Sequence, residues 1–390
     1  MFLPKDTLYE IYSFLDIKTQ INCMCTCKSI LQEKIPKGYI GMREYQQCKI
    51  LDIDKNIQEL VFRNNQDIPN IYLDAISFPI SLIINNCNSK NIYINNSKIK
   101  YLESSGHQID TIKDKFLYLD NLHSINFICG SIRTILNSFN SIRVTYINLN
   151  DNGIVNIENC FNNLKLMGLC LSNNQLRTIT LSNMDVEVLN LNHNRLSDTN
   201  LLSCNIKTLY LCHNQFKELN NLPSTVETLF VNNNKLLNNL DILYNLINLK
   251  FLDIANCNIS DISIVKNLHN LESLIASNNN INNVDILQDL TKLVVLDIAN
   301  NNINKIGNLG SSIKHLFISQ NKLEDINFMS GLVNLFLIEA SDCNIKDITP
   351  LSNLTKLGDI NISYNPIVDI NILKGLPNVY YLNCHPFKLE

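Results

Sequence analysis

Three cysteines stand at every second position near the N-terminus, in the stretch INCMCTCKSI of residues 21–30. Thiolates bind zinc and act as redox nucleophiles, so Cys23, Cys25 and Cys27 are the first candidates for a chemical site. On a helix, side chains two positions apart point about 200° away from each other, so Cys25 faces away from the other two. No fourth ligand is apparent nearby in the sequence. The spacing therefore favours thiols that pack in a core over a metal or redox site.

A second candidate is the pair His193 and His213, which hold equivalent positions in successive sequence repeats, with Cys212 beside the second. Neighbouring strands of a sheet lie about 4.8 Å apart, so such a pair could chelate a metal, and a zinc-dependent enzyme is one reading. A catalytic zinc site needs three ordered ligands and groups that orient them, which the sequence does not offer. We expect exposed residues in loops after the strands, with no metal and no cofactor.

The other residue types argue against catalysis and against two classes of partner. We find no nucleophile motif, no phosphate-binding glycine loop and no paired carboxylates, and the chain has only 11 glycines. The net charge is −4, without a run of Lys or Arg, which disfavours nucleic acid and membrane surfaces as partners. The sequence predicts a protein that is not an enzyme.

The cellular compartment follows from similar arguments. No stretch approaches the roughly 20 apolar residues that span a bilayer, and MFLPKDTLYE lacks the features of a secretory signal. Thirteen cysteines, an odd number without paired spacing, suggest reduced thiols used as small apolar groups. We expect an intracellular protein, cytoplasmic or nuclear. Hydrophobic residues make up 45% of the chain, enough for a large core.

From about residue 144 the sequence repeats itself. The units begin at the apolar residues Val144, Leu166, Val186, Ile206, Val226, Leu249, Leu271, Leu293, Ile313, Leu335, Leu357 and Val379. The intervals between these starts are 20 to 23 residues. Each unit resembles the leucine-rich repeat L-x-x-L-x-L-x-x-N/C-x-L, as in LVVLDIANNNI of residues 293–303. The resemblance implies an α/β repeat solenoid, a horseshoe with a parallel β-sheet on its concave face.

The pattern has a physical explanation. Leu296 and Ile298 flank Asp297, so the three residues form a short strand whose side chains alternate between core and solvent. An asparagine then recurs at one fixed position, where its amide can pair with backbone groups of the turn. The members of this series are Asn152, Asn174, Asn194, Asn214, Asn234, Asn279, Asn301, Asn321 and Asn365, with Cys257 and Cys343 as the alternative.

The rest of each unit resembles the class of about 22 residues, whose convex side carries 3₁₀ or irregular turns. Upstream, in residues 46–143, Leu82, Ile92, Leu102 and Ile112 recur every ten residues, which suggests narrower coils or decayed repeats. We therefore expect a degenerate solenoid over 46–143 and leucine-rich repeats with a C-terminal cap over 144–390.

Residues 1–45 do not fit the repeat. Leu8, Ile11, Tyr12 and Leu15 lie on one face of a predicted helix, and a second helical stretch, KTQINCMCTCKSILQ, follows. The segment resembles the F-box motif. The residues that carry this resemblance are Leu3, Pro4, Ile11, Leu15, Cys27 and Lys28, while Ser29 and Ile30 stand where the family often has Trp. An F-box is a three-helix module that docks on a Skp-type adaptor of a cullin-RING ubiquitin ligase. The resemblance implies an adaptor-binding surface at Leu3, Pro4, Ile11 and Leu15.

The concave face offers a second interaction surface. Residues between the two inward positions of each strand, and those two places earlier, are expected to face solvent. We predict a target-binding face from Tyr210, Phe230, Phe251, Asp253, Ile275, Asp297, Phe317, Leu337 and Glu339. A contiguous apolar group on one face often marks a protein interface, although a repeat can also tolerate drift there.

Together these features predict a substrate-recognition subunit of a cullin-RING ubiquitin ligase. The F-box would bind the adaptor, and the concave face would hold a protein target. The alternative is a scaffold or phosphatase-regulating repeat protein, in which residues 1–45 only cap the solenoid. Leu3, Pro4, Ile11 and Leu15 distinguish the two, because in a cap they face the first coil.

Overall fold

The computed structural model describes the backbone of residues 37–39, 59–63, 70–72, 81–85 and 91–93, and residues 99–384 apart from 114–118, 120, 137–138, 140–143, 158–159, 162–163, 182–183 and 324. Contacts divide the chain into two compact units, Met1–Leu209 (unit 1) and Tyr210–Glu390 (unit 2). One short strand, β15 (Thr208–Tyr210), lies at the division. The predicted F-box residues and the three N-terminal cysteines lie outside the described residues.

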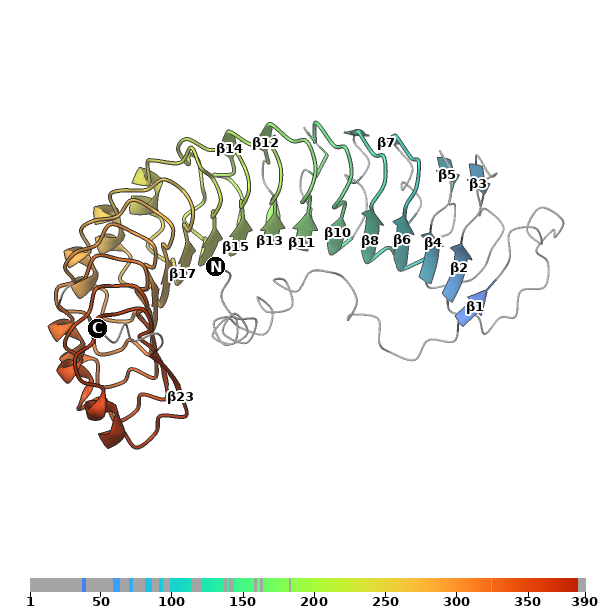
Figure 1. The fold of residues 1–390 in the computed structure, drawn as a ribbon. Helices are drawn as coiled ribbons and strands as arrows, with labels where there is room; N and C mark the ends of the chain where they lie inside the picture. Colours follow the sequence, from blue (N-terminus) through green and yellow to red (C-terminus); the bar gives the residue numbers. More distant parts are fainter. Residues whose placement is uncertain are drawn as a thin grey trace. The chain divides into compact units, whose positions relative to one another are not determined.

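Unit 1 contains a ladder of parallel strands, one from each coil (Figure 1). In pairing order they are β1 (Lys37–Tyr39), β2 (Glu59–Arg63), β4 (Ser81–Asn85), β6 (Tyr101–Ser105), β8 (Ser124–Ile128), β10 (Tyr146–Asn148), β11 (Lys165–Cys170) and β13 (Asp185–Asn190). Equivalent apolar residues pair in register: Leu60 with Leu82, Leu82 with Leu102 and Leu102 with Ile125. The order of pairing follows the chain, as in a solenoid.

Unit 1 also has short strands on the other side of its coils, visible in Figure 1 as β3, β5, β7, β12 and β14. They pair as β3 (Asn70–Tyr72) with β5 (Asn91–Tyr93), β7 (Thr111–Lys113) with β9 (Thr134–Leu136), and β12 (Thr178–Thr180) with β14 (Asp198–Asn200). Leu82 and Leu102 lie in the first ladder, whereas Ile92 and Ile112 lie in these second strands. The ten-residue spacing is therefore half a coil with a strand on each side, and the expectation of narrower coils is wrong.

Unit 2 repeats a shorter scheme, in which each coil has one strand of three residues. Its strands are β16 (Thr228–Phe230), β17 (Phe251–Asp253), β18 (Ser273–Ile275), β19 (Val295–Asp297), β20 (His315–Phe317), β21 (Leu337–Glu339), β22 (Asp359–Asn361) and β23 (Tyr381–Asn383). They pair in parallel in chain order.

The opposite side of unit 2 carries short 3₁₀ helices, as the repeat class predicted. They are η1 (Asp241–Asn245), η2 (Ser263–Asn267), η3 (Asp285–Asp289), η4 (Asn327–Gly331), η5 (Thr349–Leu351) and η6 (Asn371–Gly375). A side-chain oxygen two residues upstream accepts a bond from the first backbone N–H, as Asp261 does from Ser263 at 2.7 Å and Asp347 from Thr349 at 2.8 Å. Such local bonds satisfy a donor that a helix start leaves free, so Asp and Asn fix where each turn begins.

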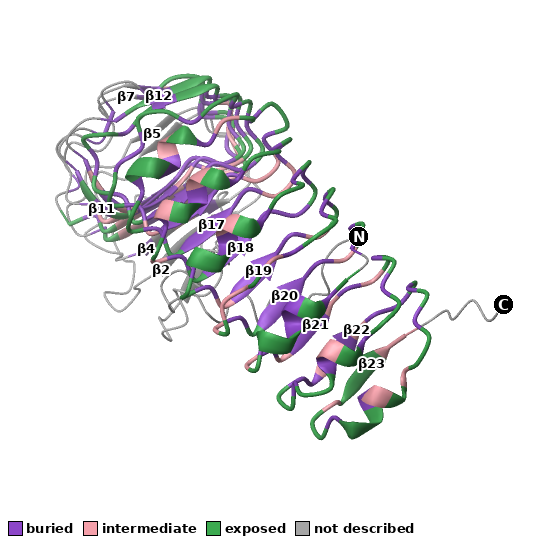
Figure 2. Cartoon of the chain, turned by 90° about the vertical axis from the view of Figure 1, so that its left-hand side faces the viewer, coloured by how far each residue is buried: buried purple, intermediate pink, exposed green. Residues whose placement is uncertain are grey.

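The central residue of each strand from β16 to β22 lies in the core, whereas Leu382 of the last strand, β23, is exposed. Leu252, Leu274, Leu296, Leu316 and Ile338 are all fully buried. Figure 2 shows β19 and β20 in the colour of buried residues and β23, the last strand, in that of exposed ones. Each coil therefore buries its apolar residues against the coils on both sides, as in other repeat proteins.

Candidate protein-interaction site

The recurring asparagines hold the coils in register. The Nδ2 of Asn301 donates to the carbonyls of Ala276 at 3.0 Å, Ile298 at 3.1 Å and Ala299 at 3.2 Å. Its Oδ1 accepts from the backbone N–H of Ile281 at 2.9 Å. Asn174, Asn279 and Asn365 repeat the pattern in their own coils. The expectation of a buried amide ladder is confirmed.

Two cysteines take the same position. The thiol of Cys257 donates to the carbonyl of Val231 at 3.3 Å, and that of Cys343 to the carbonyl of Ile318 at 3.1 Å. Both residues are fully buried, and burial raises the pKa of Cys257 to about 12 and that of Cys343 to about 11. These thiols are structural, as predicted.

His193 and His213 lie just before the ladder asparagines, with φ of 53° and 55°. The equivalent residues include Asn173, Asn278 and Asn300, with φ between 51° and 57°. Asparagine and histidine enter this left-handed region more readily than most side chains, so the backbone explains the residue types. Among the described residues, no group of three or more His, Cys, Asp or Glu is placed to bind a metal ion.

The outward side of the strands in unit 2, here called the sheet face, presents two columns of side chains. The first column contains Tyr210, Phe230, Asp253, Ile275, Asp297, Phe317 and Glu339, and the second Phe251, Ser273, Val295, His315 and Leu337. The strand register thus brings together all nine residues of the predicted target-binding face.

The expectation that these side chains are exposed is wrong. The exposed fraction is 2% for Phe317, 3% for Asp297 and 7% for Asp253, and only Glu339 is half-buried. Parallel strands lie about 4.8 Å apart, so each outward side chain touches its equivalents in the coils before and after. Alternation along one strand predicts which face a residue occupies, but stacking between coils decides how much of it reaches solvent.

Aromatic rings begin the sheet face. The rings of Tyr210 and Phe230 stack with centroids 4.7 Å apart and an interplanar angle of 7°. Phe251 follows with its centroid 4.6 Å from that of Phe230 at 40°. Offset and tilted ring pairs at such distances contribute about 0.5–1.5 kcal/mol beyond the area they bury. The three residues, here called the aromatic trio, form a continuous apolar zone.

Carboxyl groups follow the aromatic trio. Burial raises the pKa of Asp253 to about 7, that of Asp297 to about 6 and that of Glu339 to about 7. Burial also lowers the pKa of His315 to about 4, with Lys314 adding to the effect. A nearby positive charge would lower the pKa of a carboxyl, so the upward shifts of Asp253, Asp297 and Glu339 show that burial is the dominant effect there.

Sequence reasoning missed the polar residues that hold these carboxyls. The Nδ2 of Asn232 donates to Asp253, and the Oγ of Ser277 donates to Asp297 at 2.8 Å. Both donors lie two positions beyond the first column, outside the strands, where the repeat pattern carries no fixed residue type. The recurrence of Asn, Ser and Ala two places after each strand was the available signal.

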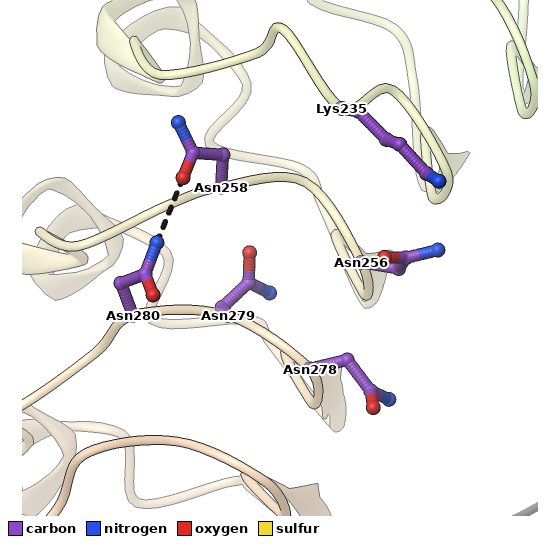
Figure 3. Close-up of a pocket in the computed structure, with 6 residues that line it drawn as sticks. All are labelled: Lys235, Asn256, Asn258, Asn278, Asn279 and Asn280. Atoms are coloured by element: carbon purple, nitrogen blue, oxygen red, sulfur yellow. Dashed lines mark hydrogen bonds between the residues drawn. The ribbon is translucent and has the colours of Figure 1, made fainter.

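A shallow polar hollow of about 250 Å³ lies beside the loops after β17 and β18 (Figure 3). It is lined by Lys235, Asn256, Asn258, Asn278, Asn279 and Asn280. Asn280 donates to Asn258 at 2.7 Å, and Asn279 belongs to the ladder. The amides are thus used within the protein, and the hollow follows from the turn geometry.

The N-terminal segment and the repeats are each similar to known proteins. The F-box domain family matches residues 2–32, and no curated protein matches the sequence. An internalin of Listeria monocytogenes superposes with a TM-score of 0.57 at 22% identity, over 73% of this chain and 80% of that one. A leucine-rich-repeat protein of Leptospira interrogans gives a TM-score of 0.56 at 18% identity, over 84% and 90% of the two chains. At these identities the likeness establishes the fold alone.

The comparisons agree with both motifs read from the sequence. F-box and leucine-rich-repeat modules are typical of proteins that act through protein–protein contacts. Within the described residues, none of the helices has the length and apolar character needed to cross a membrane. Residues 2–32 thus match the F-box domain family, and the repeats that follow have the fold of a parallel-stranded leucine-rich-repeat solenoid.

Proposed function

We propose that this protein is the substrate-recognition subunit of a cullin-RING ubiquitin ligase. The observation that carries the proposal is the F-box match at residues 2–32, on the same chain as a repeat solenoid with a continuous sheet face. The F-box binds a Skp-type adaptor through Leu3, Pro4, Ile11 and Leu15, and the solenoid holds the target. The protein contributes proximity, because the ligase and its conjugating enzyme transfer ubiquitin.

The adaptor half of the proposal is tested with Leu15→Asp in the full chain. A buried apolar anchor contributes about 2 kcal/mol or more to an interface, so affinity for a Skp-type adaptor should fall at least about thirtyfold. The matched control is Asn282→Asp, which adds the same charge at an exposed position of unit 2 and should bind normally. Failure of the unmodified chain to bind any Skp-type adaptor would refute the ligase assignment.

The same variant distinguishes a solenoid cap from an adaptor-binding module. In a cap, Leu15 packs on the first coil, so Leu15→Asp should lower the melting temperature of the repeats. In an F-box, the variant should lose the adaptor and keep its repeats folded. Circular dichroism beside the binding measurement separates these two results.

The target half of the proposal places the partner on the sheet face. The aromatic trio supports it, because aromatic side chains dominate binding energy when they lie at the centre of an interface. Phe230→Ala with Phe251→Ala should remove target capture while adaptor binding persists. Phe216→Ala, which removes a fully buried ring outside the sheet face, is the control for lost packing and should keep target capture. Retention of the full set of ubiquitinated targets by the double variant would move the site off this face.

A further inference from the structure

We infer that Asp253, Asp297 and Ser273 form a site on the sheet face, here called the acidic site, that accepts an arginine side chain of the bound protein. This inference rests on the proposed function, since it names the chemistry of the target at the same face. The three residues lie on adjacent strands β17, β18 and β19, where Asp253 pairs with Ile275 and Ile275 with Asp297. Ile275 therefore lies between the two carboxyls.

The turns alone do not explain the negative charge. One oxygen of Asp253 accepts from the backbone N–H of Ala255 at 3.0 Å, and one of Asp297 accepts from Ala299 at 3.0 Å. Asparagine makes the same contact elsewhere in this column. The equivalent bonds run to Asn148 from Asn150 at 3.1 Å, to Asn190 from Asn192 at 3.0 Å and to Asn361 from Ser363 at 3.2 Å. A neutral amide is sufficient for the turn, so the charge at Asp253 and Asp297 requires another reason.

The negative charge of Asp253 and Asp297 is not explained by an ion pair with a cation among the described residues. The ion pairs in this part of the chain join Arg133 to Asp110, Lys207 to Glu187, and Lys250 to Glu227. None of them includes Asp253 or Asp297. Burial raises the pKa of both carboxyls, and a cation bound beside them would bring those pKa values down. Within the described residues, neither carboxyl is therefore paired with a cation.

A second observation points to a ligand at the same place. The side chain of Ser273 is only 7% exposed, and its Oγ has no hydrogen-bond partner among the described residues. Ser273 lies two residues before Ile275 on β18, so both side chains leave the sheet on the same side. Burying a hydroxyl without a hydrogen-bond partner is unfavourable. A donor that reaches the acidic site would remove this penalty.

Arginine fits this arrangement better than lysine. The carboxyls are almost fully buried, so the cation must be carried on a long side chain. Two acceptors on alternate strands, with a hydroxyl two residues away on the strand between them, suit a planar group with five donors. Ile275 offers an apolar surface to the stem, and Phe230 pairs directly with Asp253 across β16 and β17. An aromatic ring beside a bound guanidinium adds a cation–π contribution. The acidic site therefore offers a guanidinium both negative charge and an aromatic ring.

The probe for this test is a library of random, uncharged-terminus peptides, selected against the full chain. We expect enriched peptides to contain arginine and to bind Asp253→Asn with Asp297→Asn at least tenfold more weakly. The Asn side chains keep the turn contacts seen in other coils, so the variant should fold normally. Asp285→Asn with Asp289→Asn, two exposed carboxyls on η3, removes the same charge and should leave peptide binding unchanged.

Replacing the peptide's arginine by citrulline, which is neutral and nearly isosteric, should cause the same loss, and the two changes should not add. Peptides that bind both proteins equally, enrichment of lysine in place of arginine, or no enriched peptide at all would each overturn the inference. Adaptor binding is measured on the same preparations. A chain that binds arginine peptides but no adaptor would refute the ligase proposal and still support arginine binding at the acidic site.

Discussion

Replacing Asn301 by alanine tests the register of the repeats most directly. The amide makes four hydrogen bonds, but its carbonyl partners do not depend on it. The carbonyl of Ala276 also accepts from Asn279, that of Ile298 from Asn321, and that of Ala299 from the backbone N–H of Asn278. The N–H of Ile281, which donates to Oδ1 of Asn301, is the group that loses its acceptor.

The expected magnitude follows from that one group. An orphaned buried donor costs about 1–3 kcal/mol, and the three lost donations add little because each carbonyl keeps another donor. Asn301→Ala should therefore lower the free energy of unfolding by about 1–3 kcal/mol.

The measurement is urea unfolding followed by circular dichroism, with hydrogen exchange to localise the change. A repeat array can unfold in steps, so exchange at the N–H of Ile281 is the sharper signal and should accelerate in the variant. Asn282→Ala, at an exposed position in the same coil, is the control and should change stability by less than about 0.5 kcal/mol. Equal losses at Asn301 and Asn282 would refute the ladder as the source of stability.

Two further predictions concern pH. His107 is buried, with its ring tilted against that of Phe127, and burial lowers its pKa from 6.5 to about 4, so the unfolded chain binds the proton more tightly. The neutral His107 side chain therefore contributes stability that is present above pH 6.5 and lost as the pH falls toward 4. His107→Phe should make the melting temperature depend less on pH over this window. An unchanged dependence of melting temperature on pH would contradict the assignment. The raised pKa of Asp253 acts in the opposite sense, because the folded protein holds that proton more tightly. Stability should fall as the pH rises from about 4 to 7, and Asp253→Asn should abolish that fall in thermal melts; a fall of the same size in the variant would exclude Asp253 as its source.

The sequence predicted the parts of the fold that depend on contacts with fixed spacing. The ladder asparagines and the central leucines, such as Asn301 and Leu296, recur at one position per coil because each must meet its equivalent in the next coil. The 3₁₀ turns of unit 2 followed from the length of the repeat. The F-box was found from its own motif, and its side chains lie outside the described residues.

Other features could not be read from spacing along the chain. The alternation of Leu82, Ile92 and Leu102 between two sheets looks the same in sequence as a coil of half the length. The burial of Phe317 and Asp297 depends on side chains about 20 residues away in each direction. The partners Asn232 and Ser277 occupy a position where small and polar residues recur, but that recurrence does not show which carboxyl each of them contacts.

Alkylation of the buried cysteines of unit 2 can be used to detect opening of its coils. Alkylating reagents attack the thiolate, and with pKa values of about 12 and 11 Cys257 and Cys343 are almost entirely protonated at neutral pH as well as fully shielded. They become reactive only when their coil opens, whereas Cys384, half-buried just after β23, should be labelled before either of them. The labelling rates of Cys257 and Cys343 therefore report how often their two coils open.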